Sequence, residues 1–213
     1  HTDYADILAI QADYLVSKDT VLFINEETEL SKRFGKVVIY DDNLPYAARI
    51  VNCLDQFYTD NHFVFMHDID ILLKSDDFLL EEIVNIMKLY DIGRVDLKID
   101  RCYANSKNPR IEIPYTSPIY LRLDTESEFT YNVNPSIWEA GEFYHVMRSN
   151  ELLGYREIEL NKDIQKRCKT ILTHRLICDY EYIIKAGYYD CTYLFKYLHI
   201  THGGRLLPIN EEM

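Results

Sequence analysis

The chain has 213 residues, 47% of them hydrophobic, and a net charge of −12, which suits one domain with a substantial core. The acidic balance argues against nucleic acid as a partner, because binding a phosphate backbone requires a basic surface. No apolar stretch is long enough to cross a bilayer, and five cysteines without a C-x-x-C pair favour reduced thiols, so we expect a cytoplasmic protein without a membrane span.

The first half of the chain alternates between helical and extended patterns. Apolar residues in "YADILAIQADYLVS" recur at helical spacing, whereas "TVLFIN" and "KVVIY" are short apolar runs typical of buried strands. Asn43 and Pro45 suit the start of one helix, and Ser75 suits the cap of another with an acidic first turn. In chain order the pattern predicts a helix over 4–17, strands over 20–25 and 36–40, a helix over 43–58, a strand over 62–67 and a helix over 75–90.

The second half is less regular. Strand patterns cover 92–100 and 110–123, and the tail "TYLFKYLHITHGGRLLP" predicts a strand that runs into a glycine turn. Helices are expected after Pro135 and from Tyr155, the second continuing to residue 172. Strands that alternate with helices predict an α/β fold with a mostly parallel central sheet flanked by helices, which binds ligands at the carboxyl ends of its strands.

A pair of carboxylates stands at such a strand end. The run "VFMHDIDILL" places Asp68 and Asp70 directly after the predicted strand 62–67. Side chains at i and i+2 of an extended segment point the same way, so both can address one ion. Because carboxylates that continue a buried strand need a compensating cation, the setting favours a metal site over a solvated turn.

The ordered set of motifs resembles a known family. An apolar strand that ends in D-x-D, a preceding helix with Arg49, then "NPSIW", "GYREIEL" and a final "HGGR" are similar to the metal-dependent nucleotide-sugar glycosyltransferases of the GT-A fold. In detail the chain resembles the amino-terminal glycosyltransferase domain of the enzymes with which chlorella-infecting viruses build capsid glycans. The resemblance implies one Rossmann-like GT-A domain over 1–213, with a nucleotide-sugar half over about 1–100 and a smaller mixed or antiparallel acceptor half over about 101–213.

The resemblance implies a divalent cation, Mn²⁺ or Mg²⁺, that bridges to the diphosphate of a UDP-sugar. Asp70 is then a direct ligand, Asp68 either binds the ion or reaches the ribose, and His202 completes the set. His199 is the alternative imidazole, but three residues away on an extended strand it would point to the other face. Two carboxylates and one imidazole suit Mn²⁺ better than Mg²⁺.

Other residues are assigned to the donor. The resemblance places Thr2, Asp3 and Tyr4 where uracil binds, although no opening strand precedes them, so either that strand is missing or "TVLFIN" takes its place. The chain has no G-x-x-x-x-G-K loop for a diphosphate, so besides the cation the available groups are Arg205, the amides of Gly203 and Gly204, and Arg49. Arg49 is otherwise a solvated helix residue.

The acceptor hydroxyl needs a base. The segment "LGYREIEL" resembles the family's helix start that carries it, which makes Glu157 the first choice and Glu159 the second, with inversion at the anomeric carbon. Acidic residues in a first turn are also favoured by the helix dipole alone. Trp138, Tyr131 and Asn134 are assigned to the acceptor site, with core packing as the alternative for the two aromatic residues.

The sequence therefore predicts an enzyme that transfers a sugar from a UDP-sugar to an oligosaccharide or glycoprotein hydroxyl. The viral resemblance adds capsid-glycan synthesis in a host cytoplasm and further enzymatic domains in a longer chain. Two alternatives stay open. One is a phosphatase of the haloacid dehalogenase type, with Asp68 as nucleophile and Asp70 as acid, and the other is a sugar-binding domain without chemistry. The transferred sugar, the acceptor and the oligomeric state cannot be predicted.

Overall fold

The computed structural model describes residues 1–2, 5–57, 61–67, 70–75, 77–97, 110–112, 121–124, 131, 135–161, 170–173, 178–182, 184–185 and 188–189. The chain divides into two compact units, and neither is one continuous stretch. The first unit takes its residues from His1–Tyr40, Asp68–Lys74 and Asp179–Met213, and the second from Asp41–His67 and Ser75–Cys178.

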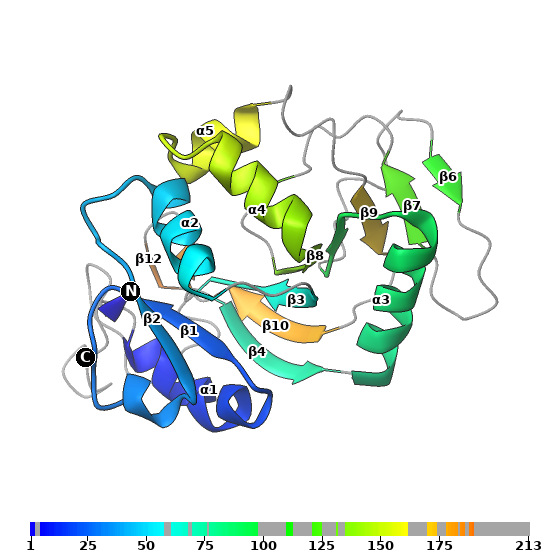
Figure 1. The fold of residues 1–213 in the computed structure, drawn as a ribbon. Coiled ribbons are helices and arrows are strands. Elements are labelled where there is room, and N and C mark those ends of the chain that lie inside the picture. Colours follow the sequence, from blue (N-terminus) through cyan, green and yellow to red (C-terminus); the bar gives the residue numbers. More distant parts are fainter. Residues whose placement is uncertain are drawn as a thin grey trace. The chain divides into compact units, whose positions relative to one another are not determined.

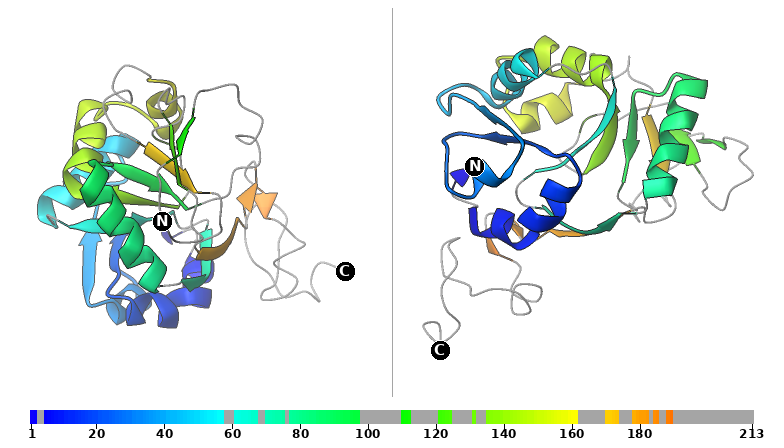
Figure 2. Two further views of the ribbon diagram at one scale, coloured as in Figure 1. Left: turned by 90° about the vertical axis from the view of Figure 1, so that its right-hand side faces the viewer. Right: turned by 60° about the horizontal axis from the view of Figure 1, so that its bottom comes forward.

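The first unit is built on a helix and a parallel strand pair. Helix α1 (Ala5–Ser17) lies beside strands β1 (Val21–Ile24) and β2 (Lys36–Ile39), which are paired in parallel (Figures 1 and 2). Leu8, Ala12 and Leu15 are buried, because spacings of four and three residues place them on one face of α1. These elements confirm the helix and the two strands expected in the first forty residues.

The first unit also contains two short strand pairs from distant parts of the chain. Strand β4 (Asp70–Ser75) pairs with β10 (Cys178–Tyr182), and β11 (Ile184–Lys185) pairs antiparallel with β12 (Tyr188–Tyr189). Strand β4 was not expected as a separate element. It places the predicted metal ligand Asp70 at the first position of a strand.

The second unit contains a six-stranded sheet in the order β3-β8-β5-β9-β7-β6. Strands β5 and β9 are parallel, and the other four neighbouring pairs are antiparallel. With the parallel β1–β2 pair, the described chain has the α/β character and both kinds of pairing that the sequence predicts. The strands are β3 (His62–Phe65), β5 (Arg94–Asp96), β6 (Arg110–Glu112), β7 (Leu121–Asp124), β8 (Ser136–Glu139) and β9 (Thr170–Thr173).

Helices of the second unit lie against opposite faces of the β3–β8 edge. Phe63 and Phe65 of β3 both contact Phe143 of α4 (Ala140–Ser149), with ring centroids 5.4 and 4.7 Å apart. Helix α2 (Tyr46–Gln56) lies beside α4 (Figure 1). Val64 instead lines a groove with α3 (Asp77–Tyr90), as expected from the two-residue period of a strand.

One predicted helix begins later than expected. Ser136–Glu139 form strand β8 rather than the first turn of a helix, and α4 starts at Ala140. The carboxylate of Glu139 accepts a hydrogen bond from the amide of Glu142 at 2.7 Å and so caps α4. Strand β8 lies between β3 and β5 and is antiparallel to both. This sheet therefore has more antiparallel pairing than the mostly parallel sheet that the sequence predicts.

A second helix is shorter than expected. Helix α5 spans Tyr155–Leu160, and Thr170–Thr173 form strand β9, so the helix predicted to residue 172 is wrong over its last part. Two threonines flank an isoleucine and a leucine there, and β-branched residues favour strands. Strand β9 pairs in parallel with β5, and the local sequence pattern did not indicate this pairing.

Candidate functional site

The D-x-D motif falls where the chain passes from one strand to the next. Strand β3 ends at Phe65, and Asp70 is the first residue of β4. Asp68 lies outside the described residues, and for Asp70 only the backbone is described. His67, the residue before the motif, is half-buried.

The side chain of Tyr46, at the start of α2, contacts three other aromatic groups. Its hydroxyl lies 2.7 Å from Nε2 of His67 and also bonds with the hydroxyl of Tyr131. Its ring is stacked with the His67 ring at 5.8 Å and meets the Tyr155 ring edge-on at 6.2 Å. Neither Tyr46 nor His67 was predicted as a site residue. The position of His67 next to the D-x-D was the one available signal, whereas Tyr46 is one of eighteen tyrosines.

The predicted catalytic base lies close along the chain to this cluster. Glu157 is exposed in the first turn of α5, and its Oε2 accepts a hydrogen bond of 2.7 Å from the amide of Gly154. Glycine has no side chain to return a bond, so only half of a capping box is formed. The adjacent Leu153 carbonyl accepts a 3.3 Å bond from the amide of Ala47, which holds this loop against the start of α2. For Glu159 the backbone alone is described.

Arg49 is engaged with the turn before α2. Its Nη1 lies 2.7 Å from the carboxylate of Asp42, its Nη2 donates to the Asp42 carbonyl at 2.6 Å, and its Nε donates to the Leu44 carbonyl at 2.7 Å. These bonds stabilise the turn that presents Tyr46. The predicted contact of Arg49 with the donor stays a prediction.

Thr2 lies beside the carboxyl end of β1. Its amide donates to Oδ1 of Asn25 at 2.8 Å, and Nδ2 of Asn25 donates to the Thr2 hydroxyl at 3.2 Å. Carboxyl ends of parallel strands are where α/β sheets bind ligands, which suits the predicted donor contact. Asn25 directly follows β1 and was not predicted.

Trp138 and Tyr131 are both fully buried. The indole of Trp138 donates to the hydroxyl of Ser136 at 2.9 Å, and the buried guanidinium of Arg94 lies 5.4 Å from its ring centroid. No face of either ring is exposed for a sugar to stack on. This burial favours the core-packing alternative that the sequence left open.

The remaining predicted site residues cannot be placed. These residues, together with Asp68, lie outside the described parts of the chain: Asp3, Tyr4, Asn134, His199, His202, Gly203, Gly204 and Arg205. Among the residues that are described, no group of three or more His, Cys, Asp and Glu side chains is close enough to hold a metal ion. Within the same residues, no helix is long and apolar enough to span a membrane.

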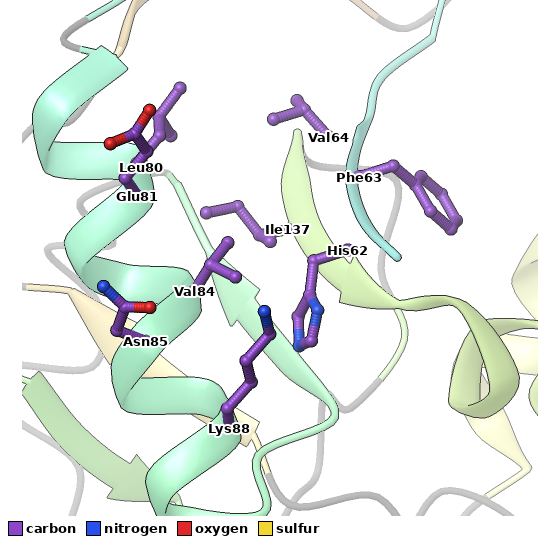
Figure 3. A pocket seen from close by; sticks show the side chains of 9 residues that line it. All are labelled: His62, Phe63, Val64, Leu80, Glu81, Val84, Asn85, Lys88 and Ile137. Carbon is purple, nitrogen blue, oxygen red and sulfur yellow. The ribbon is translucent and has the colours of Figure 1, made fainter. Parts of the chain in front are cut away.

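A groove of about 410 Å³ lies between α3 and the β3–β8 edge of the sheet (Figure 3). Apolar side chains line most of it, and Lys88 of α3 and His62 of β3 both extend into it. Burial lowers the pKa of His62, the Lys88 charge lowers that pKa further, and the Glu139 carboxylate opposes both effects. None of the residues predicted for donor, acceptor or metal lines this groove.

Cys53 of α2 has a free, buried thiol. Burial raises the pKa of its thiol to about 12. A thiol with so high a pKa stays protonated at neutral pH and is not a nucleophile. For Cys53 this agrees with the reduced thiols that the cysteine pattern favours.

The partly buried carboxylate of Glu142 makes the stability of the fold depend on pH. Burial raises its pKa first and the neighbouring Glu139 carboxylate second, so folding favours the neutral form. The folded state therefore binds more protons just above the ordinary carboxyl pKa, and stability falls as the pH rises through the raised pKa. We expect Glu142→Gln to raise the melting temperature at pH 7. The difference from wild type is expected to shrink as the pH falls from the raised pKa to the ordinary carboxyl pKa. Melting curves of Glu81→Gln, an exposed carboxylate on α3, are the control, and a constant difference at all pH values would contradict the assignment.

Comparison with known proteins gives a distant structural likeness. No family model matches the chain, and no curated protein matches its sequence. Two of the solved structures that it resembles are a UDP-glucose pyrophosphorylase complexed with UDP-glucose (TM-score 0.43, 10% identity, 80% of this chain and 79% of that chain) and an apo-UDP-glucose pyrophosphorylase (TM-score 0.46, 9% identity, 81% and 80%). At these values the likeness does not extend to an activity or a substrate.

Proposed function

We propose that the chain transfers a sugar from a UDP-sugar to a hydroxyl of a glycan, with the help of a divalent cation. The observation that carries the proposal is that Tyr46 contacts two residues that adjoin predicted functional segments. Its ring contacts His67, which precedes the D-x-D motif, and Tyr155, which stands two residues before Glu157. Glycosyl transfer to a hydroxyl requires a base within reach of the acceptor, which is the role proposed for Glu157.

The chemistry of the expected donor set fits Mn²⁺. Asp70, Asp68 and His202 would hold the ion, and they offer carboxylate oxygens and one imidazole. A bound Mn²⁺ or Mg²⁺ supplies positive charge that offsets the diphosphate leaving group. A chain with a net charge of −12 needs such compensation to hold an anionic donor.

Glu157 would accept the proton of the attacking hydroxyl. Its exposed carboxylate is held in place by the Gly154 amide, and the segment lies against the start of α2. Proton acceptance by this carboxylate gives a single displacement, with inversion at the anomeric carbon. Glu159 is the second candidate for this role.

The remaining assignments follow the family resemblance. Thr2 would lie on the uracil side of the donor, with Asp3 and Tyr4, and the diphosphate would meet Arg205 and the amides of the adjacent glycine pair. An oligosaccharide or a glycoprotein would be the acceptor, and capsid-glycan synthesis is the setting that the resemblance implies.

Melting curves with nucleotide and metal test the proposal. UDP at about 100 times its Kd is expected to raise the melting temperature by about 5–10 °C when Mn²⁺ is present and not when it is absent, because only ligands of the folded state stabilise it. The same Mn²⁺ without UDP is the control for a metal effect alone. Absence of a shift with UDP and Mn²⁺ together would contradict the proposal. Release of phosphate from an aryl phosphate would instead favour the phosphatase, and metal-independent glycan binding without nucleotide release would favour a binding domain.

A further inference from the structure

The groove between α3 and the β3–β8 edge has apolar walls that the second unit leaves partly uncovered (Figure 3). Val64 is 39% exposed, and Leu80 and Val84 are half-buried. The volume of about 410 Å³ falls within the range of about 300–1,000 Å³ that is usual for small-molecule sites. A continuous set of apolar side chains that stays open to solvent typically marks a place where something binds.

The sheet supplies one wall of the groove. Val64 of β3 is the register partner of Ile137 of β8, so their side chains lie on the same face of the sheet. His62 stands two residues before Val64 and therefore shares that face. The sheet wall is thus apolar along Val64 and Ile137 and polar at the His62 end.

Helix α3 supplies the opposite wall. Ile83 and Met87 are buried and belong to the core face of the helix. Glu81, Val84 and Lys88 recur at spacings of three and four residues, which places them on one other face of α3 that borders the groove. The helix wall is therefore apolar in its middle, with a carboxylate at one end and an ammonium group at the other.

The two ends of the groove differ in charge. Seven residues separate Glu81 from Lys88, which is two helical turns or about 10 Å along the axis. Lys88 and His62 lie together at one end, and Glu81 lies with Leu80 at the other (Figure 3). Burial lowers the pKa of His62, so its ring is mainly neutral at pH 7 and can donate one N–H. One end therefore offers two hydrogen-bond donors, and one of them is positively charged.

A second carboxylate acts on the His62 end from β8. Glu139 is the register partner of His62, and its charge opposes the effect of Lys88 on the His62 pKa. The Glu139 carboxylate accepts the hydrogen bond from the Glu142 amide at 2.7 Å and so caps α4. Because this carboxylate already has a donor, the Lys88 ammonium remains available to an anionic group in the groove.

We propose that this groove binds a small molecule with an apolar chain and a carboxylate at one end. The carboxylate meets Lys88 and His62, and the chain runs along Val84 toward Leu80. Charge complementarity with the Lys88 ammonium selects this class over neutral apolar molecules. Repulsion by Glu81 disfavours the reversed orientation. The inference does not rest on the proposed function, because the groove contains none of the residues assigned to donor, acceptor or metal.

Octanoate is a suitable probe, because it combines an apolar chain with one carboxylate. Butyrate keeps the carboxylate on a shorter chain, and 1-octanol keeps the chain without the charge. Titration calorimetry is expected to give octanoate a Kd at least about tenfold below that of butyrate and about five- to tenfold below that of 1-octanol. Absence of octanoate binding, or equal affinities for octanoate and either comparison ligand, would overturn the proposal.

Lys88→Met tests the charged end, because methionine keeps an unbranched side chain and removes the ammonium group. We expect the Kd of octanoate to rise about five- to tenfold and that of 1-octanol to stay within about twofold. A merely structural role of Lys88 would weaken both ligands alike. The matched control is Lys32→Met, which removes the same charge from an exposed lysine paired with Glu29 at 2.6 Å outside the groove. Its octanoate Kd is expected to stay within about twofold of wild type.

Val84→Phe tests the apolar part, because a larger side chain at this half-buried position occupies the groove. We expect octanoate and 1-octanol both to bind at least about tenfold more weakly. The control is Leu89→Phe, a substitution on the same helix at a side chain that is 74% exposed and does not line the groove. Wild-type octanoate affinity in either Lys88→Met or Val84→Phe would show that octanoate binds elsewhere, which overturns this inference and leaves the proposed function intact.

Discussion

Glu157→Gln is expected to lower turnover of a UDP-sugar by about 10²- to 10⁴-fold while the affinity for UDP stays close to wild type. The structure makes this substitution selective. The amide oxygen of glutamine can still accept the hydrogen bond from the Gly154 amide, because glutamine serves in a capping box as glutamate does. The start of α5 is therefore preserved, and what is lost is the ability to accept a proton. Single-turnover rates and UDP titrations separate the two effects.

A second substitution in the same region controls for charge. Glu151→Gln removes a carboxylate that pairs with Arg148 at 3.1 Å on the surface, and it is expected to change turnover little. Equal losses of turnover and UDP affinity in Glu157→Gln would assign Glu157 a structural role. Full turnover in that variant would move the base to another residue, with Glu159 as the next to substitute.

Most of the first half of the fold, with the exception of strand β4, could be predicted because its signals are local. The apolar spacing of α1, the short runs of β1 and β2, and Pro45 before α2 each report on the residues that carry them. Pro45 precedes a helix that starts at Tyr46, and its fixed φ suits that position. Such elements can be predicted without knowing which other parts of the chain they pack against.

The errors in the second half arise where a partner decides the structure. Residues 136–139 precede a good helix and were merged with it, but pairing with β3 on one side and β5 on the other makes them a central strand. Residues 170–173 were likewise joined to a helix, although they pair with β5 and β7. A single sequence shows neither partner, so its local pattern could not separate strand from helix at these places.

The charged residues assigned to the candidate site stand out in the sequence, whereas its aromatic cluster does not. Asp68 and Asp70 stand out because carboxylates that continue a buried strand need a compensating cation. Glu157 is singled out by the resemblance of its segment, since the helix dipole alone favours an acidic residue in a first turn. Tyr46 has no such signal, since its role depends on three contacts that the fold brings together. Trp138 shows the converse, because a lone tryptophan stands out in the sequence and is buried in the core.

Asp70→Asn is expected to abolish the Mn²⁺-dependent shift in melting temperature with UDP and to lower turnover by about 10²- to 10³-fold. Asparagine has nearly the same size but no charge, and a charged carboxylate is the stronger partner for a hard divalent cation. Because Asp70 is the first residue of β4, the substitution leaves the backbone pairing of that strand with β10 available. The matched control is Asp13→Asn in the same unit, which removes an exposed carboxylate that pairs with Arg33 and is expected to keep the full shift. A metal-dependent shift of wild-type size in Asp70→Asn would show that the cation is held elsewhere, and it would remove the D-x-D motif from the site.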